Sequence, residues 1–518
     1  MEKVNLYHIY EREFAYKACT AVLPGCCSVT VMQYEEMTES AEAVYIISAF
    51  RKREGVYAIR IMPEQTGKYY YRICLEEGGE AEALTVEGDF TCTAPGDGCH
   101  GKVQTKEDGF VYADGTRFLP FGTTCYAWTH QPEELQEQTV KTLKERCFNK
   151  LRMLLFPKYM PYNEEDPAVY PFEQDEDGSW DVNRIVPAYW DNLDLRLRQL
   201  GELGIEADLI LFHPYDKWGF AHLTQEASLS YVSYCIARLA AYHNVWWSLA
   251  NEYEMLMDKK TEDWDAYGCL LQKEDPYRHL ISIHQILQLY PKKAWMTHCS
   301  IQSGNIDLVP VWKKEYQLPV LIDECGYEGT LEYGWGNLSA FDMVDRFWWT
   351  VTRGGYCTHG ETFHREDAVL WWGKGGVLYG ESEPRIRFLK ELLEKLPGCG
   401  RAKVHGPHTN PNGKKGEEMT EADRHFNKLM ESTPVENLMG IMAEVHKVLF
   451  TDTWQLRYYG RTCPCFTWLQ LPEDGRYRIE IIDVWEMTRE TVMHDAVGRT
   501  RVSLPAHPGM AVLARKEE

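Results

Sequence analysis

The sequence lacks the features that mark several classes of protein. No run approaches the roughly 18 apolar residues that span a bilayer, and the first residues reach Glu11 without the apolar stretch of a signal peptide. The Gly-x-Gly-x-x-Gly stretch at 96–101 lies in a Pro- and Gly-rich linker rather than at the start of a helix-like run, which argues against a dinucleotide fold. The chain has no excess of positive charge, because 78 acidic residues outnumber 55 Lys and Arg for a formal net charge of −23, and nucleic acid or an anionic membrane would be repelled. We therefore expect a cytoplasmic protein with no nucleic-acid and no membrane partner.

Zinc-type cysteine spacing is absent as well. The chain has 16 cysteines, but none forms the Cys-x-x-Cys pair of a zinc site. Several lie in apolar, strand-like runs, namely Cys125, Cys299, Cys325 and Cys357. Reduced, buried thiols in a cytosol fit this distribution better than the disulfide framework of a small secreted domain. No motif predicts a cofactor.

The length of 518 residues predicts two to four domains. Residues 1–97 contain short runs of alternating β-branched and aromatic residues broken by Gly and Pro, which indicate an N-terminal β-sandwich. Residues 400–440 are polar and are interpreted as an excursion or linker. Residues 441–518 return to strand-like runs and predict a small C-terminal β-sandwich.

Residues 98–399 alternate short apolar runs with amphipathic stretches, the βαβα rhythm of a parallel sheet. The eight candidate strands are 118–124, 150–156, 205–212, 244–250, 280–284, 295–301, 319–323 and 355–359. The candidate helices between them are 132–146, 187–203, 225–242, 338–352 and 383–395. Eight units in under 300 residues favour a closed barrel over an open sheet. The predicted fold class is α/β, a central (β/α)8 TIM barrel flanked by the two sandwiches.

Two glutamates follow apolar strands of this predicted barrel. Glu252 comes after the fourth strand and Glu324 after the seventh. Side chains just past the carboxyl ends of barrel strands face the active site. Cleaving a glycosidic bond needs one carboxyl to protonate the leaving oxygen and another to attack the anomeric carbon or activate water. The position of these glutamates, rather than their residue type, predicts catalysis over an ordinary surface role.

At these residues the sequence resembles clan A glycoside hydrolases, which carry Asn-Glu after strand four and Glu after strand seven. The resemblance spans about residues 105–396, and the stretch from Gly55 to Tyr69 resembles the sandwich that precedes apiosidase-like barrels. The resemblance implies that Glu252 is the acid/base, that Glu324 is the nucleophile and that configuration is retained. It also implies a bond from Asn251 to a sugar 2-hydroxyl and a position near Glu324 for Arg152, whose guanidinium would hold that carboxylate ionised.

Other side chains at the predicted barrel mouth are candidate substrate contacts. The aromatic candidates are Tyr126, Trp128, Trp218 and Trp371, whose planes would stack on the C–H faces of a sugar. The polar candidates are His213, His298, His359 and Glu361. With His284, three of these histidines could instead be ligands of a metal-dependent hydrolase. No His-x-His follows the first strand, so we predict no metal.

The predicted function is a retaining glycoside hydrolase that removes a terminal sugar from an oligosaccharide or plant glycoside, with a pentose such as apiose as the first sugar to test. Two alternatives stay open: a carbohydrate-binding protein without catalysis, and a metal-dependent barrel hydrolase. The sequence identifies neither the sugar and linkage nor the choice between exo and endo action. It also leaves homo-oligomerisation open.

Overall fold

A computed structural model describes residues 2–32, 43–75, 84–107, 109–398, 400–403, 419–434 and 447–517. The chain divides into two compact units. The first is formed by residues 1–302 and 364–378, and the second by residues 303–363 and 379–518. Within the described ranges, no helix is both long and apolar enough to cross a membrane. The cytoplasmic location stays a prediction.

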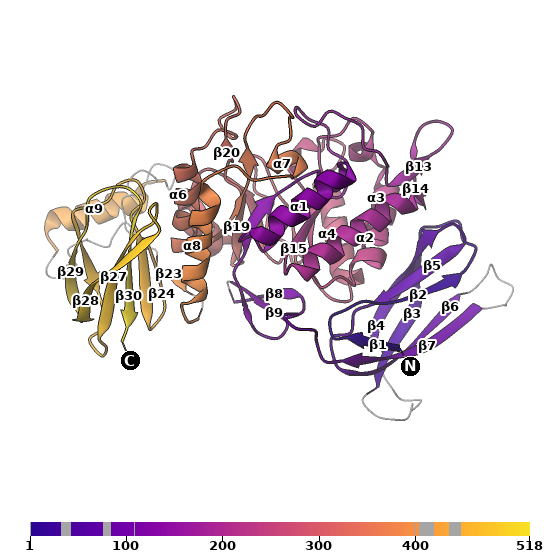
Figure 1. Cartoon of the computed structure of the whole chain (residues 1–518), viewed down its shortest axis with the longest axis horizontal. Helices are drawn as coiled ribbons and strands as arrows, with labels where there is room; N and C mark the ends of the chain where they lie inside the picture. Colours follow the sequence, from indigo (N-terminus) through magenta and orange to yellow (C-terminus); the bar gives the residue numbers. More distant parts are fainter. Residues whose placement is uncertain are drawn as a thin grey trace. The chain divides into compact units, whose positions relative to one another are not determined.

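The N-terminal part of the first unit is a seven-stranded sheet with the order β1-β7-β6-β3-β4-β5-β2 (Figure 1). Its strands are β1 (Glu2–Asn5), β2 (Tyr10–Ala15), β3 (Val22–Met32), β4 (Ala43–Arg53), β5 (Val56–Ile61), β6 (Gly67–Leu75) and β7 (Leu84–Thr93). Buried residues alternate with less buried ones along β6, as expected for a strand with one face in the core. The sheet is curled. Its curvature follows from the contact between Tyr10 of the edge strand β2 and Phe90 of β7, near the opposite edge, whose ring centroids are 4.1 Å apart. The β-rich N-terminal flank predicted from alternation is confirmed.

Eight parallel strands form the barrel, in the order β17-β16-β15-β12-β11-β21-β19-β18. They are β11 (Phe121–Thr124), β12 (Lys150–Leu154), β15 (Glu206–Phe212), β16 (Val245–Ala250), β17 (Ile281–Ser282), β18 (Cys299–Gln302), β19 (Val320–Glu324) and β21 (Tyr356–His359). The barrel closes between β17 and β18, where His284 and Ser300 form a parallel bridge. Every predicted strand overlaps one of these, so the predicted (β/α)8 barrel is confirmed.

Eight helices accompany the barrel strands within the described part of the chain. They are α1 (Glu133–Glu145), α2 (Pro187–Glu202), α3 (Gln225–Leu239), α4 (Thr261–Glu274), α5 (Val309–Tyr316), α6 (Ala340–Thr352), α7 (Trp371–Lys374) and α8 (Ser382–Glu394). Caps define some of their starts: Thr224 Oγ1 accepts a bond from Ala227 N at α3, and Ser339 Oγ accepts one from Asp342 N at α6. The five helices predicted by range correspond to α1, α2, α3, α6 and α8.

Short elements connect the barrel segments. The 3-10 turns are η1 (Trp128–His130), η2 (Phe220–His222), η3 (Tyr253–Met255) and η4 (Ile306–Leu308). The short strands are β8 (Val103–Lys106), β9 (Gly109–Tyr112), β10 (Arg117–Phe118), β13 (Phe172–Gln174), β14 (Trp180–Ile185), β20 (Glu328–Gly329) and β22 (Glu361–Thr362). Strands β13 and β14 pair as a hairpin. The segment between β12 and α2 therefore carries a short β-hairpin.

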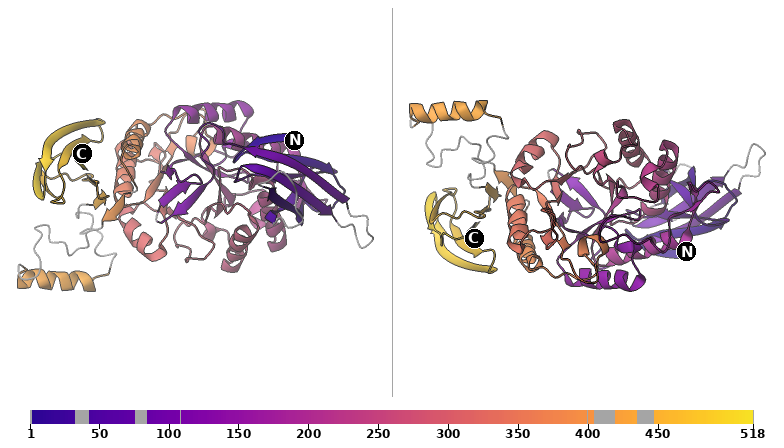
Figure 2. Two further views of the ribbon diagram at one scale, coloured as in Figure 1. Left: turned by 90° about the horizontal axis from the view of Figure 1, so that it is seen from below. Right: turned by 90° about the horizontal axis from the view of Figure 1, so that it is seen from above.

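The C-terminal part of the second unit has two β layers. A six-stranded sheet has the order β23-β24-β25-β30-β27-β28, and β26 pairs with β29. The strands are β23 (Arg401–Lys403), β24 (Lys447–Phe450), β25 (Trp454–Tyr458), β26 (Phe466–Gln470), β27 (Tyr477–Asp483), β28 (Thr488–Ala496), β29 (Arg499–Ser503) and β30 (Met510–Lys516). Leu469 and Val502 of the two-stranded layer share one buried core with Ile479 and Val512 of the six-stranded sheet. The C-terminal strands are curved (yellow in Figure 2). The β-rich C-terminal flank is confirmed.

The predicted polar excursion at 400–440 lies largely outside the described residues. Its described parts are 400–403 and 419–434, the second of which contains helix α9 (Glu421–Ser432). Thr420 and Asp423 form a capping box at the start of this helix. The domain boundaries derived from composition stay a prediction.

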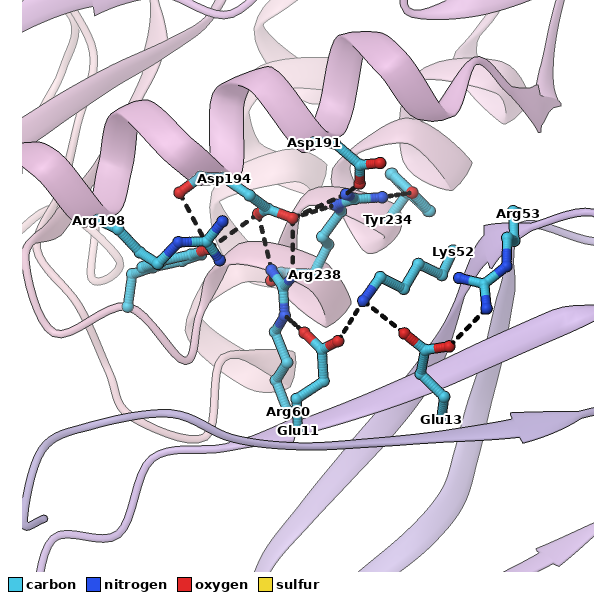
Figure 3. Close-up of polar contacts among 11 residues, drawn as sticks. Glu11, Glu13, Lys52, Arg53, Arg60, Asp191, Asp194, Arg198, Tyr234 and Arg238 are labelled. Atoms are coloured by element: carbon cyan, nitrogen blue, oxygen red, sulfur yellow. Dashed lines mark hydrogen bonds and ion pairs between the residues drawn. The ribbon is translucent and has the colours of Figure 1, made fainter. Parts of the chain in front are cut away.

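Within the first unit, a buried ionic network joins the N-terminal sheet to helices α2 and α3 (Figure 3). Arg60 of β5 contacts Asp194 of α2 with both terminal nitrogens at 2.7 Å, and its Nε contacts Glu11 of β2 at 2.7 Å. Arg238 of α3 donates to the same aspartate at 2.7 Å. Burial alone would raise the pKa of Asp194, but the two guanidinium groups offset this and lower it below its usual value. The network holds the sheet against the barrel helices with its charges compensated.

In the second unit, strands β24 and β25 contact helix α6, and helix α8 contacts the turn between β27 and β28. Tyr458 Oη of β25 donates to Asp345 of α6 at 2.7 Å. Arg385 of α8 lies over the Trp485 ring, 3.6 Å from its centroid, and donates from Nε to the backbone oxygen of Trp485 at 2.9 Å. Burial raises the pKa of Asp345 above its usual value.

Candidate active site

Glu252 lies just past the carboxyl end of β16, all six residues of which are buried. It precedes η3 with left-handed backbone angles, φ 50° and ψ 58°. Such angles are uncommon for a residue other than glycine, and strained residues of this kind cluster at functional sites. Glu252 is only 4% exposed, and the next residue, Tyr253, donates its N–H to the His284 oxygen at 3.0 Å. The turn therefore fixes the direction in which this carboxyl points.

Asn251, next to this glutamate, lies at the centre of a buried polar cluster in the first unit. Its Oδ1 accepts bonds from Tyr126 Oη at 3.0 Å and from Arg152 Nη2 at 2.9 Å. Arg152 also donates from Nη1 to Tyr126 Oη at 2.7 Å. The structure thus brings together three residues that the sequence singled out, one within β12 and the others just past β11 and β16. The predicted position of Arg152 beside Glu324 stays a prediction.

A lysine that the sequence analysis did not single out lies against the same cluster. Lys158 Nζ is 3.8 Å from the ring centroid of Tyr126, 4.3 Å from that of Tyr215 and 4.6 Å from that of Trp372. Tyr215 Oη in turn donates a short hydrogen bond to Glu252 Oε2. Lys158 and Tyr215 follow the second and third barrel strands, and that position is the signal that could have identified them.

Two of the predicted histidines are buried and neutral. His213, directly after β15, contacts the Phe156 oxygen through Nε2 at 3.2 Å. Burial, followed by the Lys158 ammonium, lowers the pKa of His213 to about 3. Burial likewise lowers the pKa of His359, the last residue of β21, to about 3. A neutral imidazole can both donate and accept a hydrogen bond, as contact with a sugar hydroxyl requires.

The prediction that His298 lies at the barrel mouth is wrong. Strand β18 begins at Cys299, after His298, whereas the apolar run over 295–301 predicted a strand that includes the histidine. The His298 ring packs against Trp246, near the start of β16, and Phe110 of the hairpin before the barrel, with centroids 5.3 and 5.9 Å apart. His298 therefore lies at the amino-terminal end of the barrel, where conserved packing rather than catalysis is usual.

The aromatic candidates differ in exposure. Trp128 is fully buried and Trp371 is 2% exposed, with Nε1 of the latter donating to Thr123 Oγ1 at 2.8 Å. Burial of this kind favours packing over contact with a sugar. Trp218 is half-buried and its ring lies beside Tyr159 and Tyr170, with centroids 6.4 and 6.2 Å away. This cluster is the better candidate for stacking on a substrate.

In the second unit, Glu324 is the last residue of β19 and is 9% exposed. Its backbone oxygen accepts a bond from Ser303 N at 2.8 Å. All five residues of the strand are buried, so the glutamate terminates a run that the core holds in place.

The predicted contact Glu361 belongs to a second group of buried side chains in this unit. Glu328, His359 and Glu361 bring their ligand atoms within 4.8 Å of one another, and they are the one such group among the described residues that could hold a metal ion. Glu361 Oε2 accepts a bond from Tyr379 N at 2.7 Å, and Glu328 Oε1 accepts one from Glu381 N at 2.9 Å. Of the four histidines considered as metal ligands, only His359 is in this group. The two carboxylates also accept backbone N–H bonds from the segment that leads into α8.

The comparisons with known proteins agree with this architecture. Residues 104–397 match the family model "Apiosidase-like, catalytic domain", and residues 443–515 match a domain of unknown function, DUF5605. No curated protein matches the chain.

Among solved structures, the chain is similar to a proposed glycoside hydrolase from Bacteroides vulgatus ATCC 8482, with 32% identity, a TM-score of 0.82 and coverage of 100% of both chains. It is also similar in fold to a glycoside hydrolase family 5 structure from the same organism, with 14% identity, a TM-score of 0.60, and coverage of 80% of this chain and 94% of the other. The family model spans more than half of the chain, and the first of these structures extends the likeness over its whole length. The chain therefore belongs to the apiosidase-like family and is a glycoside hydrolase.

Proposed function

We propose that this protein is a retaining glycosidase in which Glu252 is the acid/base and Glu324 is the nucleophile. The observation that carries the proposal is the position of the two residues along the barrel strands. Glu252 lies two residues past β16, and Glu324 is the final residue of β19. Because the carboxyl ends of parallel barrel strands lie at one end of the barrel, both carboxyls belong to the end where catalysis occurs in this fold.

The proposed chemistry has two steps. Glu324 attacks the anomeric carbon while Glu252 protonates the leaving-group oxygen, and the glycosidic bond breaks to give a glycosyl-enzyme ester. Glu252, now ionised, then takes a proton from a water molecule, whose oxygen attacks the anomeric carbon and releases the sugar and Glu324. This mechanism predicts carboxyl groups about 5–5.5 Å apart, whereas inversion would need about 6.5–9.5 Å.

We also propose that the substrate carries a terminal pentose, with apiose the first candidate, on an oligosaccharide or plant glycoside. The support is membership of the apiosidase-like family, and the neutral His213 and half-buried Trp218 are suitable contacts for hydroxyl groups and a ring face. A panel of aryl glycosides and plant glycosides would identify the sugar. NMR of the first product formed would show whether the anomeric configuration is retained.

The roles of the two glutamates can be separated by kinetics. With Glu252→Ala, an aryl glycoside with a good leaving group needs little protonation, so the first step should keep much of its rate, and azide should speed turnover because it attacks the intermediate without a general base. Glu324→Ala should lose activity by several orders of magnitude, because no glycosyl-enzyme forms. Equal losses in both variants, neither rescued by azide, would refute the assignment.

A further inference from the structure

Lys158 occupies an unusual environment for a lysine. It is 2% exposed, and its ammonium group lies within 4.6 Å of the ring centroids of Tyr126, Tyr215 and Trp372. These rings come from three segments, after β11, after β15 and within α7, while the lysine itself follows β12. Aromatic faces attract a cation electrostatically, and more strongly when water is excluded. The ammonium therefore holds these segments together at the carboxyl ends of the strands.

The backbone links the lysine to one of these rings. Tyr159, the residue after Lys158, donates its N–H to the Tyr215 oxygen at 2.8 Å. The loops after the second and third barrel strands are thus joined both by this hydrogen bond and by the contact of the ammonium with the Tyr215 ring. A tyrosine held at its backbone and at its ring face has little freedom to move its hydroxyl.

That hydroxyl donates to Glu252 Oε2. A donor to a carboxylate stabilises the ionised form over the protonated form. The positive charge on the face of the Tyr215 ring acts in the same direction, because it makes the phenol O–H a stronger donor and attracts the carboxylate electrostatically. Lys158 therefore contacts the Tyr215 ring, and the Tyr215 hydroxyl contacts Glu252.

We propose that Lys158 is a positioning residue for the acid/base, acting through Tyr215 to stabilise the ionised Glu252 that must accept a proton from water in the second step. The proposal rests on the proposed function, because it assumes that Glu252 is the acid/base. In this proposal Lys158 affects catalysis through Tyr215 and does not itself contact the substrate.

Other titratable groups are brought toward Glu252 by elements of the same unit. His213 is neutral, since burial and then the Lys158 ammonium lower its pKa to about 3. Arg152 carries a permanent positive charge, and its Nη2 donates a hydrogen bond to Oδ1 of Asn251, the residue before Glu252, at 2.9 Å. His284 contacts the segment through its backbone oxygen, which Tyr253 N–H meets at 3.0 Å. Tyr215 contacts the carboxylate itself, because its hydroxyl donates to Glu252 Oε2.

The experiment measures kcat/KM against pH with an activated aryl glycoside for the wild type, Lys158→Met, Lys158→Arg and Tyr215→Phe. The basic limb of this profile reports loss of the proton from the acid/base of the free enzyme. Removing the cation should move that limb upward by about one pH unit. Lys158→Arg should restore most of the wild-type profile, because a guanidinium also binds aromatic faces. Tyr215→Phe keeps the ring and should shift the limb in the same direction.

Azide provides a second readout. Below the raised pKa of Glu252 in Lys158→Met, a smaller fraction of this carboxyl is ionised, so the base-catalysed second step should slow and kcat should fall by up to about tenfold. Azide needs no base and should recover most of this loss. A lysine that only supported the fold would lower kcat without such rescue.

Lys259 supplies a matched control. Its Nζ lies 5.6 Å from the Phe212 ring centroid and donates to Ser228 Oγ at 2.7 Å. Lys259→Met makes the same chemical change at a lysine with aromatic contacts in the same unit, so it should lower thermal stability while leaving the basic limb in place.

The double variant Lys158→Met/Tyr215→Phe tests the route. If the lysine acts through the tyrosine, the limb of the double variant should match that of Tyr215→Phe alone, whereas additive shifts would overturn the route. A basic limb that stays at the wild-type pH in both single variants would overturn the proposal itself. If Lys158→Met does not fold, Tyr215→Phe and Lys158→Arg decide the question by the same criterion. Failure of azide to rescue Glu252→Ala would instead refute the proposed function.

Discussion

Glu206 at the start of β15 should make the protein less stable as the pH rises. The residue is 2% exposed, and its Oε2 accepts a bond from Trp246 Nε1 at 2.9 Å. Burial raises the pKa of Glu206 from its ordinary value of 4.5 to about 8, although the indole N–H acts in the opposite direction. Between these two values the folded protein keeps a proton that the unfolded chain has lost. The free energy of unfolding must therefore fall as the pH rises through this window.

The size of the effect follows from the two pKa values. A difference of about 3.5 units corresponds to about 5 kcal/mol over the whole window, at about 1.4 kcal/mol for each pH unit. Glu206→Gln keeps the shape and the acceptor for the Trp246 indole but cannot titrate. Its stability relative to the wild type should therefore increase by about 3 kcal/mol between pH 5 and about pH 7.5.

Urea denaturation followed by tryptophan fluorescence, repeated at several pH values, measures this difference. The comparison uses the slope against pH, so a constant cost of the substitution does not affect it. Glu134→Gln, at an exposed glutamate in the first turn of α1, is the matched control and should follow the wild type at every pH. If the curves for Glu206→Gln and the wild type run parallel from pH 5 to about pH 8, the carboxyl is not protonated in the fold and the reasoning is refuted.

The barrel was predictable because its strands are nearly continuous apolar runs, which parallel strands buried on both faces require. All six residues of β16 and all seven of β15 are buried, and both stand out in the sequence. The start of a strand is harder to locate. Trp295 and Met296 are apolar and buried but precede β18, so the apolar run over 295–301 placed His298 at the wrong end of the barrel.

The polar surroundings of Glu252 were only partly predictable. Asn251 and Arg152 lie in or beside strands, so their positions follow from the strand periodicity. Lys158 and Tyr215 lie in loops, where the sequence pattern gives a position after a strand but no direction for the side chain. The contact between them depends on the backbone bond from Tyr159 to Tyr215, a tertiary interaction that no single-sequence pattern encodes.

Three further predictions concern stability and metal dependence. Asp194→Asn should lower the free energy of unfolding by about 3–5 kcal/mol, because it leaves two buried arginines poorly compensated, and calorimetry would show this as a lower Tm; an unchanged Tm would contradict it. Gly380→Ala should cost about 1–3 kcal/mol, because a Cβ there would lie 2.4 Å from Glu328 Oε2 and 2.6 Å from Glu361 Oε1, and urea denaturation would measure the loss. EDTA should leave activity unchanged. Glu328 and Glu361, which lie beside His359, already accept backbone N–H bonds from the segment before α8, and these bonds compensate part of the negative charge without a cation. Activity that EDTA abolishes and that zinc or manganese restores would refute the two-carboxylate mechanism, and His359→Ala should then abolish the metal requirement together with catalysis.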